Sequence, residues 1–497
     1  MNYGTVIKVL GKLLIIEAAF MILPFLVSLY YNESDGVVFL ISILIIGIIG
    51  FIMNRSFNYE KGIKAKEGLA IVVFGWVLVS IFGSLPFVFS KSIPSWIDAF
   101  FETVSGFTTT GATIIDNIEI LPKGILFWRS FTHWIGGMGI LALTIIIIPT
   151  LGVGGFQIFK VESPGPAPDR IVPKVRDTAK VLYTIYLIFT VFQIVLLLIG
   201  HMPLFDSVLH TFGSVGTAGF SIKNASIGAY DSTYIHLVIG VFMILSGVNY
   251  SLYYFLYKGK WKEVIKDEEL RLYLGIIFIS VVLIALNINK EIYHNIGLSI
   301  RDSFFQVSSI ITTTGYATVD FNKWPTFSKT ILFLLMFVGG SAGSTVGGIK
   351  VIRILVLIKL IKREFAKIFH PRSMIPIKIG DKVVPNETVA GISSFFALYM
   401  LIFILGTIVI SLEGIDFESS VSAAAATLGN VGPGFGFIGP SKTYSQFSYP
   451  GKLLLSIFML WGRLELFTII ALFSPMTWKK EMLSNKGRFR LKKLWRR

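Results

Sequence analysis

The sequence predicts an all-α polytopic membrane protein with about ten transmembrane helices and four re-entrant loops. Three observations lead to this fold class. Hydrophobic residues make up 54% of the 497 positions and charged residues only 15%, whereas soluble domains contain about 45–50% and roughly 25%. Many apolar runs reach the roughly 20 residues that a helix needs to cross a bilayer. One polar stretch that ends in glycine also recurs four times along the chain.

Ten spans are predicted, separated by loops that alternate between basic and non-basic. The spans cover residues 7–31, 37–54, 69–90, 125–150, 180–200, 235–256, 272–289, 328–362, 388–411 and 452–474. Most of the 45 Lys and Arg lie in the first dozen residues, 54–67, 160–180, 257–271, 350–382 and the tail 479–497. By the positive-inside rule, this alternation places both termini in the cytoplasm. We therefore expect a multi-pass protein of the cell (inner) membrane.

The repeated stretch begins at an acidic residue and ends at a glycine. The four pairs are Asp98 and Gly111, Asp206 and Gly219, Asp302 and Gly315, and Glu418 and Gly432. The separation is 13 residues in the first three pairs and 14 in the fourth. Such spacing in units of about a hundred residues indicates internal repetition. Each unit is predicted to be a helix, a half-helix with a glycine-ended loop, and a helix. Asp98, Asp206 and Asp302 are predicted to cap the N-terminal ends of their half-helices.

These repeats divide the chain into six parts. The predicted parts are an N-terminal transmembrane hairpin (1–60), repeat 1 (61–157), repeat 2 (158–260), repeat 3 with an intramembrane loop (261–370), repeat 4 (371–478) and a basic tail (479–497). The first span contains Glu17 and lacks a small-residue cleavage site, so it is predicted to be a retained helix and not a signal peptide. Residues 375–384 alternate in polarity and turn at Gly380-Asp381, which predicts a small β-hairpin.

The four glycine-ended loops are predicted to meet around one water-filled axis. Non-helical backbone at membrane depth must be buried in protein or line an aqueous cavity. The half-helices direct their negative ends into that cavity, which favours a cation. Carbonyl oxygens can replace the hydration shell of an alkali cation, and glycine reaches φ > 0 without a Cβ that would block the axis. The candidate ligands are Thr109, Thr110, Gly111, Ala218, Gly219, Thr314, Gly315, Val431 and Gly432. The alternative is that these small residues serve only close helix packing.

The eighth span contains a glycine-rich run that is predicted to break it. The run holds Gly339, Gly340, Ser341, Ala342, Gly343, Ser344, Thr345, Gly347 and Gly348. Each glycine in a helix costs about 1 kcal/mol relative to alanine, so a loop that lines the axis is expected. The alternative is a close helix crossing of the GxxxG kind. Arg463 lies inside the last span, where an ionisable residue is a functional hypothesis by default; a structural ion pair with a neighbouring helix is the alternative.

Five motifs resemble those of the Trk/Ktr/HKT superfamily of potassium transporters, and specifically of its TrkH family. They are Ser105–Thr113 (SGFTTTGAT), Trp134–Gly139 (WIGGMG), Ala218–Ser221 (AGFS), Thr312–Tyr316 (TTTGY) and Asn430–Gly434 (NVGPG). The resemblance covers about residues 60–475. It implies a potassium-channel-like, pseudo-fourfold pore for potassium uptake, with the nine candidate ligands as its selectivity filter and the loop and Arg463 as its gate. Sodium-preferring members often have serine at the position of Gly111, so the resemblance implies potassium here. The fourth loop departs from the other three because Asn-Val-Gly-Pro replaces the threonine run.

The resemblance also implies partners. Family members form homodimers and bind a cytoplasmic ring of TrkA-type regulator-of-conductance subunits, which hold the regulatory nucleotide. The expected docking surfaces are the basic loops 257–271 and 350–382 and the tail. No cofactor is expected in this chain, which has no Walker A motif and whose GxGxxG match at 434–439 follows no strand. No nucleic-acid partner is expected either, because the sequence shows no groove-reading module.

Two other classes of function remain to be weighed against a pore. A proton- or sodium-coupled secondary potassium transporter would bind its substrate at broken helices within inverted repeats, whereas these four repeats run in the same orientation. An enzyme is not expected, because HExxH is absent, no GxSxG nucleophile elbow marks a hydrolase, and the chain has no cysteine for a cysteine-ligated metal.

Overall fold

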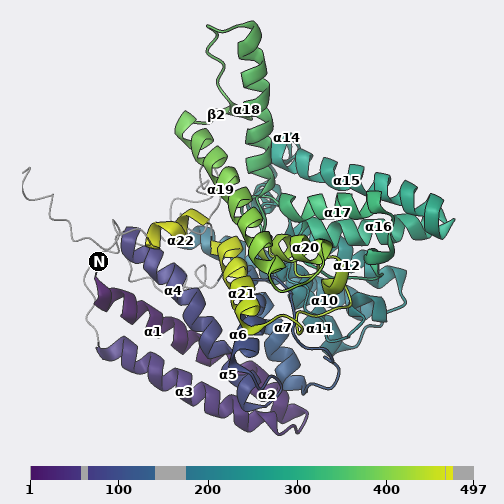
Figure 1. Ribbon diagram of the computed structural model, residues 1–497. Coiled ribbons are helices and arrows are strands. Elements are labelled where there is room, and N and C mark those ends of the chain that lie inside the picture. Colours follow the sequence, from purple (N-terminus) through teal and green to yellow (C-terminus); the bar gives the residue numbers. More distant parts are fainter. Residues whose placement is uncertain (1, 57–64, 140–174, 465, 474–497) are drawn as a thin grey trace, which may run out of the picture.

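The computed structural model describes residues 2–56, 65–139, 175–464 and 466–473. These residues form helices and one two-stranded sheet (Figure 1). The predicted tail 479–497, most of the basic segment 160–180 and residues 140–150 of the predicted fourth span lie outside the described residues.

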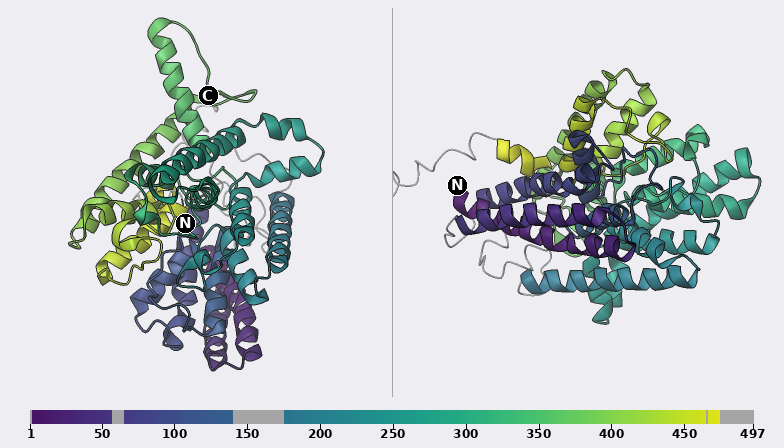
Figure 2. Two further views of the ribbon diagram at one scale, coloured as in Figure 1. Left: turned by 90° about the vertical axis from the view of Figure 1, so that its right-hand side faces the viewer. Right: turned by 90° about the horizontal axis from the view of Figure 1, so that it is seen from below.

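The N-terminal hairpin consists of α1 (Tyr3–Phe20), α2 (Ile22–Tyr30) and α3 (Asp35–Ser56). Two glycines let α1 and α3 approach closely: a Cβ on Gly11 would lie 2.7 Å from the carbonyl oxygen of Gly50, and one on Gly50 would lie 2.8 Å from that of Gly11. Small residues at a crossing allow such backbone contact between membrane helices. The hairpin lies at the edge of the molecule, where α1 also packs against α4 (Figure 2).

We describe the helices and strands after the hairpin in four groups, each with one glycine-ended loop. The first contains α4 (Ala65–Gly83), α5 (Leu85–Phe89), α6 (Trp96–Phe107) and α7 (Lys123–Gly137), and the second contains α10 (Val175–Ile199), α11 (Leu204–Gly216), α12 (Thr233–Ser246), α13 (Tyr250–Tyr257) and α14 (Trp261–Lys266). The third contains α15 (Glu268–Ile288), α16 (Ile296–Ile311), α17 (Thr326–Val338) and α18 (Val351–Phe369), and the fourth contains β1 (Lys378–Ile379), β2 (Lys382–Val383), α19 (Asn386–Ser411), α20 (Phe417–Leu428), α21 (Tyr449–Leu464) and α22 (Leu466–Phe473). The short helices and their successors contact one another in a closed ring: α6, α7, α11, α12, α16, α17, α20, α21 and again α6.

The number of spans agrees only in part with the ten predicted. By length and composition, six helical segments of the described chain could cross a membrane, or seven if the bent pair α12–α13 is one span. The prediction of a continuous span at 235–256 is wrong, because α12 and α13 meet at 92°. The break is stabilised from outside: Ser341 N donates to the carbonyl of Gly247 at 2.9 Å, and Tyr250 N donates to that of Gly343 at 3.1 Å.

The acidic residues of the repeat do not cap the short helices as predicted. The N-cap positions of α6, α11, α16 and α20 are Ser95, Pro203, Asn295 and Asp416. Asp98 and Asp206 lie in the first turn of their helices, still near the positive end of the dipole. Asp302 lies further along, since α16 begins at Ile296. Asp98 pairs with Lys452 at 2.7 Å, and Asp206 accepts a hydrogen bond from the Tyr230 hydroxyl at 2.6 Å.

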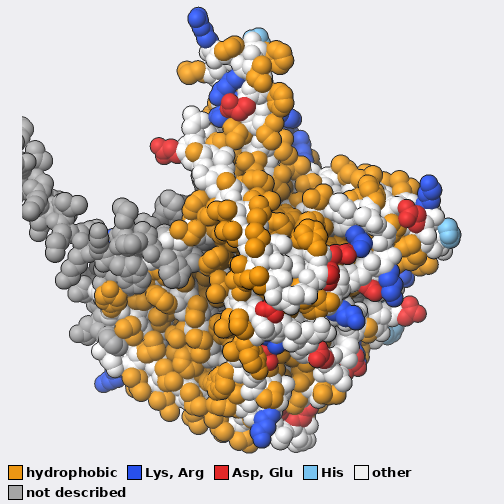
Figure 3. Space-filling view, in the orientation of Figure 1, with side chains coloured by type: hydrophobic (Ala, Val, Ile, Leu, Met, Phe, Trp, Pro, Cys, Tyr) orange, Lys and Arg blue, Asp and Glu red, His pale blue; other side chains and the backbone are white. Residues whose placement is uncertain are grey.

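The surface separates into an apolar face and a projecting arm. Hydrophobic side chains cover the face formed by the hairpin (Figure 3), and α3 exposes Val37, Leu40, Ile41, Leu44, Ile48, Phe51 and Ile52. Such a surface fits contact with lipid. The arm, which consists of α18 and the β1–β2 hairpin, projects from the top of the molecule in Figure 1. The β-hairpin prediction is confirmed, because Lys378 pairs with Val383 and Ile379 with Lys382.

Candidate functional site

The four glycine-ended loops meet in a closed ring. Their glycines have left-handed backbone, with φ of +78° at Gly111, +79° at Gly219, +82° at Gly315 and +93° at Gly432. A Cβ on each glycine would strike a carbonyl oxygen of the next loop. These contacts would be Gly111 with Ala218 (2.2 Å), Gly219 with Thr314 (1.9 Å), Gly315 with Val431 (2.3 Å) and Gly432 with Thr110 (2.4 Å). The fourth contact returns to the first loop, so a side chain at any of these glycines would force the ring apart.

The ring brings the nine predicted ligand residues together. Its oxygens nearest the glycines are the carbonyls of Thr110, Ala218, Thr314 and Val431, one from each loop. Uncharged carbonyl oxygens in a ring suit an alkali cation that has lost its water. Among the residues that the structure describes, no group of three or more His, Cys, Asp or Glu side chains could hold a metal ion.

The residue two positions before each glycine also has left-handed backbone. The sequence did not predict this conformation. The φ angles are +56° at Thr109, +54° at Thr217, +51° at Thr313 and +56° at Asn430. Alignment of the loops on their glycines already places these four residues at one position. The backbone conformation is therefore fourfold even though the side chains are not: Asn430 donates to the Thr110 hydroxyl at 2.9 Å, whereas the Thr313 hydroxyl accepts from Gly347 N at 2.9 Å.

Buried side chains form hydrogen bonds to the backbone of the loops. The Tyr444 hydroxyl donates to the Gly432 carbonyl at 2.7 Å, and the Tyr316 hydroxyl donates to the Phe220 carbonyl at 3.1 Å. Arg129, whose side chain is 1% exposed, donates to Glu102 at 2.6 Å and to the Ser221 carbonyl at 2.8 Å. A buried charge that is paired and hydrogen-bonded on both sides keeps its neighbours in one geometry.

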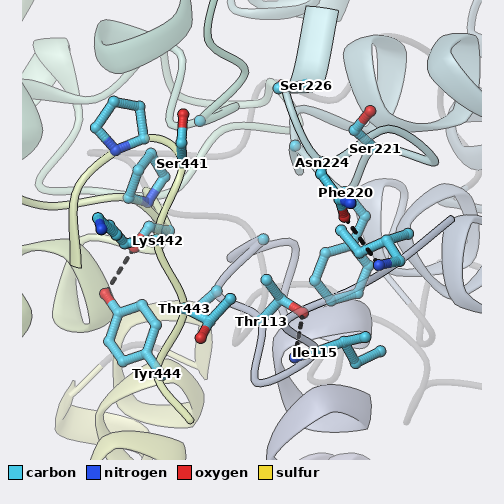
Figure 4. Close-up of a pocket in the computed structure, with 18 of the residues that line it drawn as sticks. Thr113, Ile115, Phe220, Ser221, Asn224, Ser226, Ser441, Lys442, Thr443 and Tyr444 are labelled. Carbon is cyan, nitrogen blue, oxygen red and sulfur yellow. Dashed lines mark hydrogen bonds between the residues drawn. The ribbon is translucent and has the colours of Figure 1, made fainter. Parts of the chain in front are cut away.

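A cavity of about 90 Å³ opens onto the ring, and all four glycines line it. Lys442, Thr443 and Tyr444 lie on one side of this cavity, and Phe220, Ser221 and Asn224 lie on the other (Figure 4). The walls come mostly from residues that follow the glycines in sequence. Asp116 contributes a carboxylate, which accepts a hydrogen bond from the Ser445 hydroxyl at 2.9 Å.

The loop between α17 and α18 contacts the residues that precede the glycines. The predicted break of the eighth span is confirmed, since α17 ends at Val338 and α18 begins at Val351. The alternative of a continuous helix crossing is thereby wrong. The ends of the loop meet, because a Cβ on Gly339 would lie 3.2 Å from the Cα of Gly348. We call residues 339–350 the intramembrane loop.

Hydrogen bonds join the intramembrane loop to the ring and to Arg463. Gly347 N donates to the Thr313 hydroxyl at 2.9 Å, and the hydroxyls of Thr217 and Thr345 lie 3.1 Å apart. Arg463 donates through Nη1 to the Thr345 carbonyl at 2.7 Å. Its Nη2 donates to the carbonyls of Gly136 and Gly137 at the end of α7, at 2.7 and 3.1 Å. The guanidinium thus bridges the loop and α7 through carbonyl oxygens.

The fold and the site together define a polytopic membrane protein in which one chain surrounds a ring of carbonyl oxygens suited to a cation. A family model described as "TrkH: Cation transport protein" matches residues 37–480, so the chain belongs to the TrkH family of cation transport proteins. This confirms the family resemblance seen in the sequence.

Individual relatives agree over nearly their full length. The chain is 39% identical to the Trk system potassium uptake protein TrkH of Escherichia coli (strain K12), with 97% of this chain and 100% of that protein covered. It is 35% identical to the Trk system potassium uptake protein TrkG of the same organism, with 94% of this chain and 97% of that protein covered. The crystal structure of the potassium transporter TrkH from Vibrio parahaemolyticus matches with a TM-score of 0.87 at 35% identity, with 96% and 100% covered.

Proposed function

We propose that this protein carries potassium into the cell through a selective pore formed by a single chain. The observation that carries the proposal is the closed ring of four carbonyls, each packed against the glycine of the adjoining loop. Relatives of 35–39% identity are named potassium uptake proteins. Selectivity depends on the number and field of the coordinating dipoles, so a filter only one or two rings deep discriminates modestly against sodium and passes rubidium nearly as well as potassium.

Flux through the purified protein in liposomes tests this function. An outward potassium gradient, with equal pH on both sides and no sodium, should drive uptake of rubidium-86. Added external potassium should inhibit that uptake more than the same concentration of sodium. Equal inhibition by the two ions would contradict a potassium-selective filter.

The competing function is coupled transport with protons or sodium. A broken helix at the site is the feature that such transporters share, and α12–α13 and α17–α18 are both broken here. Measured reversal potentials separate the two functions. The potential of a pore does not move with an imposed pH gradient, whereas that of a proton symporter does. A sodium symporter would carry no rubidium in the absence of sodium, whereas a pore would.

The intramembrane loop is proposed to be the gate. It is hydrogen-bonded to Thr217 and Thr313 of the ring and to Arg463, so it obstructs the axis on the side away from the cavity. Because the loop ends meet, deletion of residues 339–348 can join Val338 directly to Ile349. The deletion should raise rubidium flux while the preference for potassium persists. Flux at the wild-type level would contradict the gate.

Regulation is proposed to come from a cytoplasmic TrkA-type ring that binds nucleotide, and the active form to be a homodimer with both termini in the cytoplasm. The projecting arm supports a docking role, since it carries Lys359, Lys362, Arg363 and Lys367. Co-purification of the two proteins, with uptake measured with and without nucleotide, tests the partnership. A nucleotide effect that survives without the ring would contradict it.

A further inference from the structure

Glu269, near the start of α15, is a buried carboxylate with one partner on the intramembrane loop and one on α18. Its side chain is 6% exposed. One oxygen, Oε1, accepts a hydrogen bond from Ala342 N at 2.7 Å and another from Ile352 N at 3.1 Å. Ala342 belongs to the intramembrane loop and Ile352 to the first turn of α18. A single carboxylate oxygen therefore holds the loop and the helix that follows it.

This contact caps the N-terminus of α18, for which the local sequence provides no side-chain cap. The first backbone N–H groups of a helix require partners outside the helix, and the N-cap residue of α18, Lys350, provides no side-chain cap. Glu269 supplies the acceptor from another helix, at the end of α18 where a negative charge is favoured. Without it, two buried N–H groups would lose their acceptor, which is costlier than loss of an exposed hydrogen bond.

The preceding residue, Glu268, binds the projecting arm. Its Oε2 forms an ion pair with Nζ of Lys359 on α18, and its Oε1 accepts a hydrogen bond from Gly380 N, in the turn of the β-hairpin, at 3.0 Å. Lys359 Nζ also donates to the carbonyl of Lys378 on β1 at 2.6 Å. Glu269 thus binds the intramembrane loop and the first turn of α18, whereas Glu268 binds α18 further along and the β-hairpin.

We propose that Glu268 and Glu269 form a latch between the arm and the gate. Glu269 is a positioning residue that keeps the intramembrane loop beneath the ring, and Glu268 keeps the arm in register with it. A protein partner that displaces the arm pulls on the start of α15 through Glu268 and weakens the hold of Glu269 on the loop. The inference rests on the proposed function in two respects, that the loop limits flux and that the arm receives the partner.

The position of the loop can be tested without any transport measurement. The chain has no cysteine, so Ser344→Cys, at a partly exposed loop position, provides the single thiol for labelling with a methanethiosulfonate reagent. In this background Glu269→Ala should raise the labelling rate about tenfold, as expected when buried N–H groups lose their acceptor. Glu269→Gln keeps an oxygen that can accept both hydrogen bonds and should label at nearly the wild-type rate. Equal rates for the alanine, glutamine and wild-type proteins would overturn the latch.

A shorter acid provides a second variant in case the alanine variant does not fold. Glu269→Asp keeps the charge but withdraws the carboxylate by one methylene, so labelling should again rise above that of the glutamine variant. Labelling of the aspartate variant at the rate of the glutamine variant would also overturn the proposal.

Charge exchange tests the link to the arm. Glu268→Lys and Lys359→Glu should each raise labelling at position 344, and the double variant should return it toward the wild-type rate. Labelling that is the same in the single and double variants would overturn the role of Glu268. Rubidium flux measured on the same samples separates the two ideas: if labelling changes and flux does not, the latch stands and the gate proposal fails.

Discussion

At the scale of single residues, the ring depends on backbone conformations that most residues avoid. Left-handed backbone costs about 1–2 kcal/mol for a residue with a Cβ, yet Thr109, Thr217, Thr313 and Asn430 adopt it beside the four glycines. The sequence predicted positive φ at the glycines because only glycine fits a crowded axis. It did not predict the conformation of the threonines, whose hydroxyl partners belong to segments distant in sequence. Thr217 and Thr313, for instance, bind the intramembrane loop.

Arg463 is expected to restrain that loop. Replacement of Arg463 by alanine removes the hydrogen bonds to Thr345, Gly136 and Gly137, so rubidium flux should rise severalfold while potassium remains preferred over sodium. Replacement by lysine keeps the charge but loses the planar, multi-donor geometry of the guanidinium. The flux of the lysine variant should therefore lie between that of the wild type and that of the alanine variant. Liposome uptake of rubidium-86 measures both variants. Flux of the alanine variant at or below the wild-type level would rule out this restraint.

Thr313 provides a test of the contact between ring and loop. Thr313→Val keeps the shape of the side chain and removes the hydroxyl that accepts from Gly347 N. The buried N–H then loses its partner at a cost of about 1–3 kcal/mol, so the loop should loosen and flux should increase. Thr313→Ser retains the hydroxyl and serves as the matched control. If valine and serine variants conduct alike, this hydrogen bond has no part in gating.

At the scale of elements, local signals predicted the breaks that lie within their own sequence. The five glycines of residues 339–348 predicted the interruption of the eighth span, and Gly380-Asp381 predicted the turn of the β-hairpin. The bend between α12 and α13 was missed because its free backbone groups bond to Ser341 and Gly343, about 90 residues later. The helix caps were missed because a shared spacing to the glycine does not fix where a helix begins: Asp98 and Asp206 lie two residues after the first residue of their helices, and Asp302 lies six residues after it.

The α1–α3 crossing gives a prediction at this scale. Gly50→Leu places a side chain against the backbone of Gly11 and should destabilise the protein by about 1–3 kcal/mol, as overpacked cores are. Gly47→Leu, on the same helix, meets no atom within 4 Å of its Cβ and should leave stability unchanged. Thermal unfolding in detergent, followed by size-exclusion chromatography, compares the two. Equal midpoints would show that the crossing does not need glycine at this position.

At the scale of the whole molecule, four glycine-ended loops of one chain close a ring. The repetition was visible in the sequence, since the four glycines share a register with an upstream acid. The order in which the loops contact one another could not be predicted, because no local sequence signal indicates that α21 packs against α6 or that Gly432 packs against Thr110. The ten spans stay a prediction, since length and composition support six or seven in the described chain. Sequence repetition predicts that the chain contains similar segments. Whether these segments close into a ring depends on contacts between the first and the last of them.

The measurement that tests the central claim most directly is rubidium-86 uptake into liposomes by wild-type protein and Gly111→Ser, with potassium or sodium as competitor. The serine Cβ would lie 2.2 Å from the Ala218 carbonyl, so the ring must open and its preference for potassium should fall. Gly275→Ser is the matched control, because nothing lies within 4 Å of its Cβ. The account predicts wild-type selectivity in the control and reduced potassium preference in Gly111→Ser. Unchanged competition by potassium and sodium in the Gly111→Ser protein would contradict a filter built from these four loops.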